Sequence, residues 1–243
     1  MKEAHNHTGN CINTVFKVST LLLLLPFFMA GSGTVCFAGQ AKPSAAVTAV
    51  QLNTYLGELD TVINNAEEIY DHAKLNKWKH VANKLNVIKK TEQSRLIAAN
   101  DASTNLLPRL IEATADLEQA VTTQHRLDTM IFANRIMIIG AKMAAPFNPR
   151  IPTNVAVIGY SARKLEILSE AQHVEKMSDV VYKIHLSWQP LIPQVIEHGG
   201  SREIKKFAEI MKRLEAAKTP DEYARHATSV LEEVTVLEQI FLK

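Results

Sequence analysis

The side chains best suited to chemistry in this 243-residue chain are its histidines. Seven of them follow residue 50, at positions 72, 80, 125, 173, 185, 198 and 226. A zinc site on a helix needs two histidines three or four residues apart, and no pair has that spacing. His72 and His80 are eight residues apart, which would place them at different angles on one continuous helix. The spacing therefore predicts no metal ion, and no cofactor of another kind is predicted.

His185 is the histidine that adjoins an apolar helical pattern, formed by Ile184 and Trp188. Some small helical cytochromes hold haem iron between one histidine and one methionine. The methionines available in the helical part of the chain are Met130, Met137, Met143, Met177 and Met211. No Cys-x-x-Cys-His motif is present for covalent haem attachment, and core methionines usually fill gaps. His185 is therefore only a candidate haem or metal ligand, in second place to a role without a cofactor.

A second candidate site centres on Asn134, which lies among apolar residues at helical spacing. A buried amide must find hydrogen-bond partners, either within the protein or from a ligand. The structural role is the favoured one. In the alternative, Asn134 lines a ligand pocket, and Arg135, Lys142 and Arg163 attract an anion. A solvated polar stripe explains Arg135 and Lys142 equally well.

The chain lacks the local motifs by which many enzymes are identified. It contains no nucleophile elbow, phosphate-binding loop, dinucleotide fingerprint or paired glycosidase carboxylates. Its formal charge is +2, without the clustered basic face that a nucleic-acid partner requires. We therefore expect a protein that is not an enzyme and does not bind nucleic acid.

The central element is the segment Leu127–Ala145, which is apolar on most of its circumference and is therefore predicted to be a buried helix. The charges of Asp128, Arg135 and Lys142 argue against a membrane span, which needs about 20 mostly apolar residues. Three prolines within residues 146–152 end this helix, because proline lacks the backbone donor and clashes with the preceding turn. This break divides the helical domain, residues 51–243, into halves at 51–145 and 151–243.

The remaining periodicity predicts an all-α fold, an antiparallel bundle of about eight helices arranged as four helical hairpins. Asn76, Ser201 and Thr219 are candidate helix caps, and Thr219 begins a capping-box sequence. Trp78 and Trp188 are expected to be packing anchors, one in each half. A faint internal repeat overlays residues 66–98, 162–194 and 208–240. The expected helices lie near 52–70, 78–88, 106–121, 127–145, 155–168, 177–188, 201–214 and 220–241.

Residues 1–38 have the layout of a secretory signal peptide. Lys2 and Lys17 precede an apolar run over 18–30, and cleavage is expected after Ala38. Residues 39–50 are small and polar and are expected to form a flexible lead-in. An uncleaved membrane anchor through 18–38 is the main alternative. Both cysteines, Cys11 and Cys36, lie in this segment, so cleavage would leave a mature chain without cysteine.

These features favour an exported, periplasmic or secreted binding or protein-interaction module of the cell envelope, with an unknown partner and no membrane insertion after cleavage. The alternative is a periplasmic carrier of a small ligand, haem or a metal, with its site between the two halves. An enzyme is the third possibility.

Overall fold

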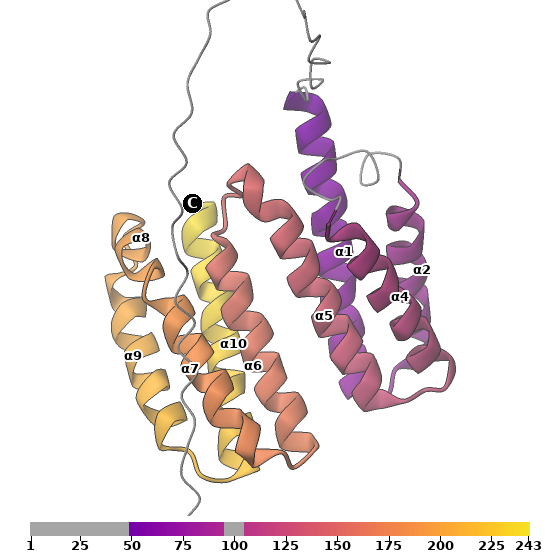
Figure 1. The fold of residues 1–243 in the computed structure, drawn as a ribbon. Coiled ribbons are helices and arrows are strands. Elements are labelled where there is room, and N and C mark those ends of the chain that lie inside the picture. Colours follow the sequence, from indigo (N-terminus) through magenta and orange to yellow (C-terminus); the bar gives the residue numbers. More distant parts are fainter. Residues whose placement is uncertain (1–48, 95–104) are drawn as a thin grey trace, which may run out of the picture. The chain divides into compact units, whose positions relative to one another are not determined.

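The computed structural model describes residues 49–94 and 105–243, which belong to one compact unit. The regular structure of these residues is entirely helical, which confirms the all-α prediction (Figure 1). The predicted signal segment, most of the lead-in and the connection at 95–104 lie outside the described residues. The helices are α1 (Ala49–Lys74), α2 (Trp78–Glu92), α4 (Leu107–Thr122), α5 (Arg126–Ala144), η2 (Ala145–Phe147), α6 (Thr153–Glu170), η3 (Val174–Lys176), α7 (Met177–Trp188), α8 (Leu191–Glu197), α9 (Ser201–Ala216) and α10 (Pro220–Leu242).

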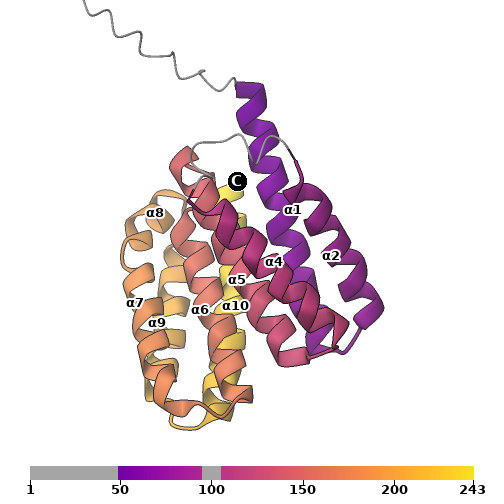
Figure 2. The ribbon, with the colours of Figure 1, turned by 45° about the vertical axis from the view of Figure 1, so that its right-hand side comes forward.

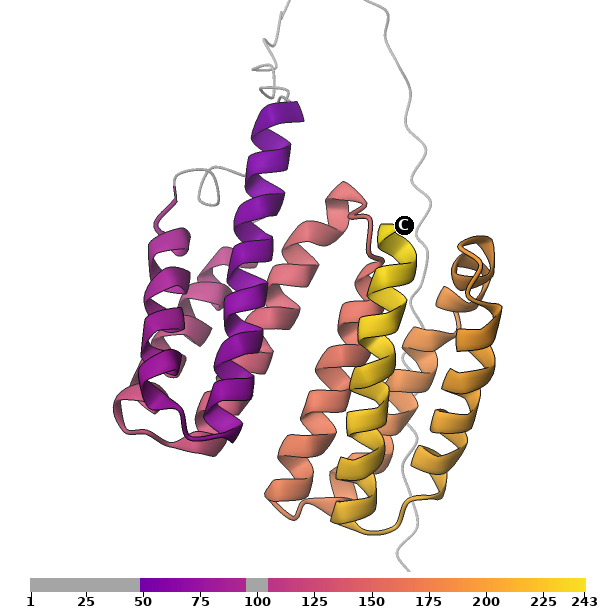
Figure 3. The ribbon, with the colours of Figure 1, turned by 180° about the vertical axis from the view of Figure 1, so that it is seen from behind.

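Four antiparallel hairpins, α1–α2, α4–α5, α6–α7 and α9–α10, turn at the same end of the bundle (Figures 1 and 3). In each of the first three turns, one residue adopts positive φ and an N–H bonds the carbonyl five residues earlier, as in a Schellman helix terminus. The positive-φ residues are Asn76, Gln124 and Gln172.

Two of the three expected caps are corrected by this geometry. Asn76 ends α1 in the left-handed conformation, which asparagine tolerates, and Lys77 precedes α2. Ser201 is the first residue of α9, after Gly200. Thr219 forms the predicted capping box with Glu222 at the start of α10.

The hairpins follow a regular step along the sequence. The three positive-φ turn residues are 48 residues apart, and the same step joins Ile88, Ile136 and Ile184, each 0% exposed. The predicted repeat overlaid residues 66–98 on 162–194. The offset between these ranges is two such steps, so the prediction missed the hairpin that lies between them. A slightly shorter step, of about 46 residues, leads from Ile184 to the buried Val230 of the fourth hairpin.

Each half of the bundle has a hydrophobic core of its own. One core comes from α1, α2, α4 and α5 with Ile167 of α6, and the other from α6 to α10. In both halves the first helix packs against the last, α1 on α5 and α6 on α10 (Figure 2). The helices of the two halves therefore follow one another in the same spatial order. The two halves meet where α5 packs against α6.

The central helix α5 is buried as predicted, with twelve of its nineteen residues inside the bundle. Gly140 brings α1 close, since a Cβ there would lie 2.7 Å from Cγ1 of Ile63. Ile131, in the second turn of α5, is an exception within this helix and is 38% exposed. Among the described helices, only Arg126–Phe147 is long and apolar enough to cross a membrane, and most of it is buried by its neighbours.

The two tryptophans are buried to different extents. Trp188 is 4% exposed and stacks on Phe207, with ring centroids 4.1 Å apart. Trp78 is only partly buried at the edge of the other core. After Trp188 the chain bends at Pro190 into the short helix α8, which Gly199 ends at φ 79°.

Candidate functional site

Among the described helices around the second core, the most exposed large apolar side chain is Tyr182 of α7. The inward face of this helix carries the buried Val180, Val181 and Ile184. On the outward face, Tyr182 is 62% exposed and Leu186 is 52% exposed. A hollow adjoins this face of α7 on each side.

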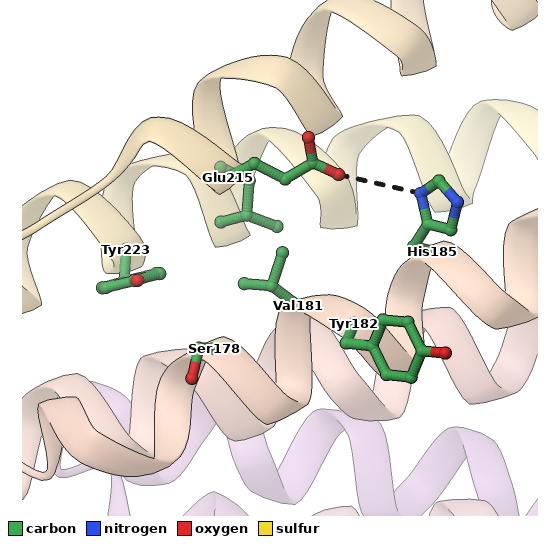
Figure 4. Close-up of a pocket in the computed structure, with 7 residues that line it drawn as sticks. Ser178, Val181, Tyr182, His185, Glu215 and Tyr223 are labelled. Carbon is green, nitrogen blue, oxygen red and sulfur yellow. Dashed lines mark ion pairs between the residues drawn. The ribbon is translucent and has the colours of Figure 1, made fainter.

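The first hollow, here called the α7–α9 groove, has a volume of about 370 Å³ (Figure 4). His185 and Glu215 face each other across it, with Nδ1 3.7 Å from Oε1. Its remaining walls are largely apolar. The groove is lined by Ser178, Val181, Tyr182, His185, Leu214, Glu215 and Tyr223.

His185 therefore lies at the rim of a groove and not in the helical core. Its side chain is half-exposed and its nearest charged neighbour is Glu215. Met177 and Met211, the two methionines of this half, are buried in the core and do not line the groove. The structure thus brings His185 together with a carboxylate, and no described methionine joins it.

In the first half, side-chain contacts bridge the corresponding helices, α2 and α4. Between α2 and α4, Lys89 Nζ lies 2.5 Å from Glu118 Oε1, and the Thr114 hydroxyl donates to Glu92. Burial raises the pKa of Glu92 to about 7. In the second half, the His185–Glu215 pair bridges α7 and α9 in a similar way.

The second hollow, here called the lysine groove, lies between α7 and the α5–α6 pair and has a volume of about 290 Å³. Lys142 and Lys183 line this groove. Lys164 lies close enough to Lys183 and to Lys176 for their charges to interact. Burial lowers the pKa of Lys164, and the charges of Lys183 and Lys176 lower it further. None of these four lysines has a described carboxylate within 4 Å. The lining residues are Ile138, Lys142, Val157, Tyr160, Ser161, Lys183, Leu186 and Ser187.

A third hollow of about 190 Å³, here called the junction cavity, lies between the halves beside α5 and the proline-rich break. Three carboxylates line it, from Asp60, Glu67 and Glu238. Burial raises the pKa of Asp60. Burial and the nearby Glu67 raise the pKa of Glu238, against the opposing effect of Arg163. The cavity is thus acidic, and it suits a small cation or neutral molecule better than an anion.

Polar contacts also join the halves beside this cavity. Glu166 of α6 is buried and accepts hydrogen bonds from the Tyr70 hydroxyl at 2.7 Å and from Lys74 Nζ at 3.0 Å, both on α1. The Thr228 hydroxyl of α10 donates to the same carboxylate at 3.2 Å. Burial and the Glu166 carboxylate raise the pKa of Tyr70, so its hydroxyl keeps its proton.

The four residues of the predicted anion site lie apart. Asn134 Nδ2 donates to the Tyr160 carbonyl at 3.0 Å, which is the structural role that the sequence favoured, while its Oδ1 has no partner among the described residues. Arg135 pairs with Glu112 and Asp116 of α4, and Arg163 pairs with Glu67 of α1. Of the four, Lys142 alone lines the lysine groove.

Sequence reasoning missed Tyr182, Lys183 and Leu186 as surface residues. Their signal was present, because Tyr182 and Leu186 are apolar, four residues apart, and off the stripe of Val181, Ile184 and Trp188. Apolar residues on the outer face of an amphipathic helix indicate a contact surface. Within the described residues, no group of three or more His, Cys, Asp or Glu side chains is placed to hold a metal ion.

No protein-family model, curated protein or solved structure matches the chain.

Proposed function

We propose that this chain is an exported, non-enzymatic binding module of the cell envelope and that α7 with its two grooves binds a partner protein. The observation that carries the proposal is the α7–α9 groove of about 370 Å³, which lies beside the exposed ring of Tyr182. Exposed tyrosine next to an apolar hollow is typical of interface centres.

The chemistry of the two grooves specifies the kind of partner. Four lysines without carboxylate partners in the described structure flank one side of α7. An amphipathic helix or strand with acidic residues would neutralise them and place apolar side chains against Leu186 and into the α7–α9 groove. The proposed occupant is therefore an acidic, amphipathic segment of another protein.

Site-specific photo-crosslinking in cells tests this proposal. A photoreactive phenylalanine analogue replaces Tyr182, and the matched control replaces Asn86, the exposed residue of α2 at the equivalent place two repeat steps earlier. Crosslinking of a discrete polypeptide is expected from position 182 and not from position 86. Similar products from both positions, or none from position 182, would contradict the proposed surface.

Charge reversal tests the acidic nature of the partner. K142E with K183E is expected to abolish the crosslink from position 182. The control, K79E with K90E, makes the same charge change on exposed lysines of α2 and is expected to leave it intact. Equal crosslinking in both double variants would exclude charge recognition by the lysine groove.

The junction cavity supports the second candidate, a small-ligand carrier with its site between the halves. At about 190 Å³ it is smaller than the roughly 300–1,000 Å³ of most ligand pockets, so a small cationic molecule suits it better than haem. Native mass spectrometry of protein purified from its own envelope tests this function. A bound small molecule that D60N with E238Q removes would support the carrier, and a bare protein would count against it.

A further inference from the structure

We propose that His72 and His80 form a binding site for a divalent transition-metal ion such as Ni²⁺ or Cu²⁺. The two imidazole rings face each other across the α1–α2 turn, with centroids 4.9 Å apart and planes inclined by 34°. This site is separate from the α7 surface and from the junction cavity, and it does not depend on the function proposed above.

The turn between the helices brings the two histidines together. The chain reverses at Asn76, so positions 72 and 80 lie opposite each other on α1 and α2. One helical turn further from the reversal, the two helices are joined by an ion pair, in which Lys84 Nζ lies 2.6 Å from Glu68 Oε2. Eight residues of continuous helix would have separated the rings. The spacing argument from the sequence therefore failed at this pair because a reversal lies between its members.

Backbone hydrogen bonds fix the positions of both residues. The Lys77 N–H donates to the His72 carbonyl at 2.9 Å, and the Lys77 carbonyl accepts from the His80 N–H at 3.0 Å. Both histidines are thus tied to the same turn residue. A pair held on rigid elements loses little freedom on chelating an ion, which favours binding.

The separation of the rings fits a shared ion. A metal–nitrogen bond of about 2.0–2.1 Å places the ion about 3.2 Å from the ring centre. If the two metal–nitrogen bonds meet at the ion at about 90–110°, the centroids of the two rings lie about 4.5–5.2 Å apart. The observed 4.9 Å falls in this interval, and rotation about χ2 of histidine is soft enough to turn both ring nitrogens toward one point.

The donor set selects the class of metal. Imidazole suits Ni²⁺, Cu²⁺ and Zn²⁺, whereas a closed structural zinc site needs four protein ligands. The described residues supply no third His, Cys, Asp or Glu here, so water would complete the coordination sphere. His72 is half-buried and His80 is exposed, which leaves the site open to solvent and to exchange.

Isothermal titration of the full-length chain with NiCl₂ tests the site. His5 and His7 also lie in the full chain, so the relevant quantity is the difference between variants that all retain them. H72Q and H80Q are each expected to weaken one binding event by about tenfold or more, because loss of either ligand removes the chelate. H226Q, which alters a histidine outside the pair, is the matched control and is expected to leave that event unchanged.

Nuclear magnetic resonance gives a readout that does not depend on how a variant folds. In the wild-type chain, substoichiometric Ni²⁺ is expected to broaden the imidazole signals of His72 and His80 together. The proposal is overturned if the binding event survives in H72Q and H80Q, or if the two signals stay sharp while those of other histidines broaden.

Discussion

Glu92 is a single residue whose environment makes the stability of the protein depend on pH. Its folded pKa is about 7, against an ordinary value of 4.5, because burial between α2 and α4 disfavours the charged carboxylate. The folded state therefore binds more protons than the unfolded state between these values, and stability is expected to fall as pH rises from about 4.5 to 7. Partial exposure limits the effect to about 1 kcal/mol.

Urea denaturation at pH 5 and pH 8 measures this dependence. E92Q keeps the shape of the side chain and removes its titration. It should therefore lose less stability than the wild type between the two pH values. An unchanged difference in E92Q would mean that another group causes the pH dependence.

The two tryptophans give a second prediction at this scale. W188A is expected to cost about 3–5 kcal/mol of unfolding free energy, because it removes a buried ring stacked on Phe207. W78A is expected to cost less, since Trp78 is only partly buried. Chemical denaturation of both variants checks the order, and a greater loss in W78A would contradict it.

Sequence reasoning at the residue scale succeeded where a side chain interacts within its own helix or turn. The capping box of Thr219 with Glu222 is local, and its spacing alone predicted it. It failed where partners come from separate helices. Arg163 was an anion ligand only in the less favoured alternative, and its pairing with Glu67 of α1 was not foreseen. The pairing of His72 with His80 depends on a turn whose conformation the sequence did not reveal.

At the scale of helices, the contact of α1 with α5 depends on a residue without a side chain. Replacing Gly140 by alanine places a Cβ 2.7 Å from Cγ1 of Ile63, so the helices must separate or Ile63 must move. We expect G140A to cost about 1–3 kcal/mol.

Gly57 is the matched control, because it too lies inside a helix, α1, but a Cβ there meets nothing within 4 Å. G57A should stabilise the protein by about 0.5–1 kcal/mol, since alanine favours helix over glycine. Thermal unfolding of the two variants distinguishes close packing from helix propensity. Shifts of the same sign would refute this account of Gly140.

The helix positions were largely predictable because hydrophobic periodicity is local. The prediction for α5 held over most of its length, but the sequence could not show that Ile131 is 38% exposed. The end of α7 at residue 188 was predicted, yet the short helix α8 that follows Pro190 was not, because a proline shows where a helix breaks and not how the chain continues.

For the whole molecule, the polar junction between the halves should determine whether they unfold together. Glu166 of α6 accepts bonds from Tyr70 and Lys74 of α1, and Arg163 pairs with Glu67. A single unfolding transition is expected for the wild type. R163Q with E166Q should weaken this link and separate the unfolding of the two cores.

The protein contains one tryptophan reporter in each half, since Trp78 and Trp188 are the two in the chain. W78F leaves a reporter for the second core, and W188F leaves one for the first. Fluorescence transitions should coincide in these single variants and diverge when R163Q with E166Q is added. Coincident transitions in both backgrounds would show that the polar contacts do not couple the halves.

The four-hairpin arrangement followed from the number of amphipathic segments and the short connections between them. The similar order of helices in the two halves could not be predicted, because the middle hairpin of the repeat carries the polar residues Thr114 and Thr129 at buried positions.

The common end of the hairpin turns also fixes where the chain enters the bundle. Because the four hairpins all turn at one end, the first residues of α1 and the last of α10 both lie at the other end (Figures 1 and 3). The His72–His80 pair beside the α1–α2 turn therefore lies at the end of the bundle away from the first residues of α1 and the last residues of α10.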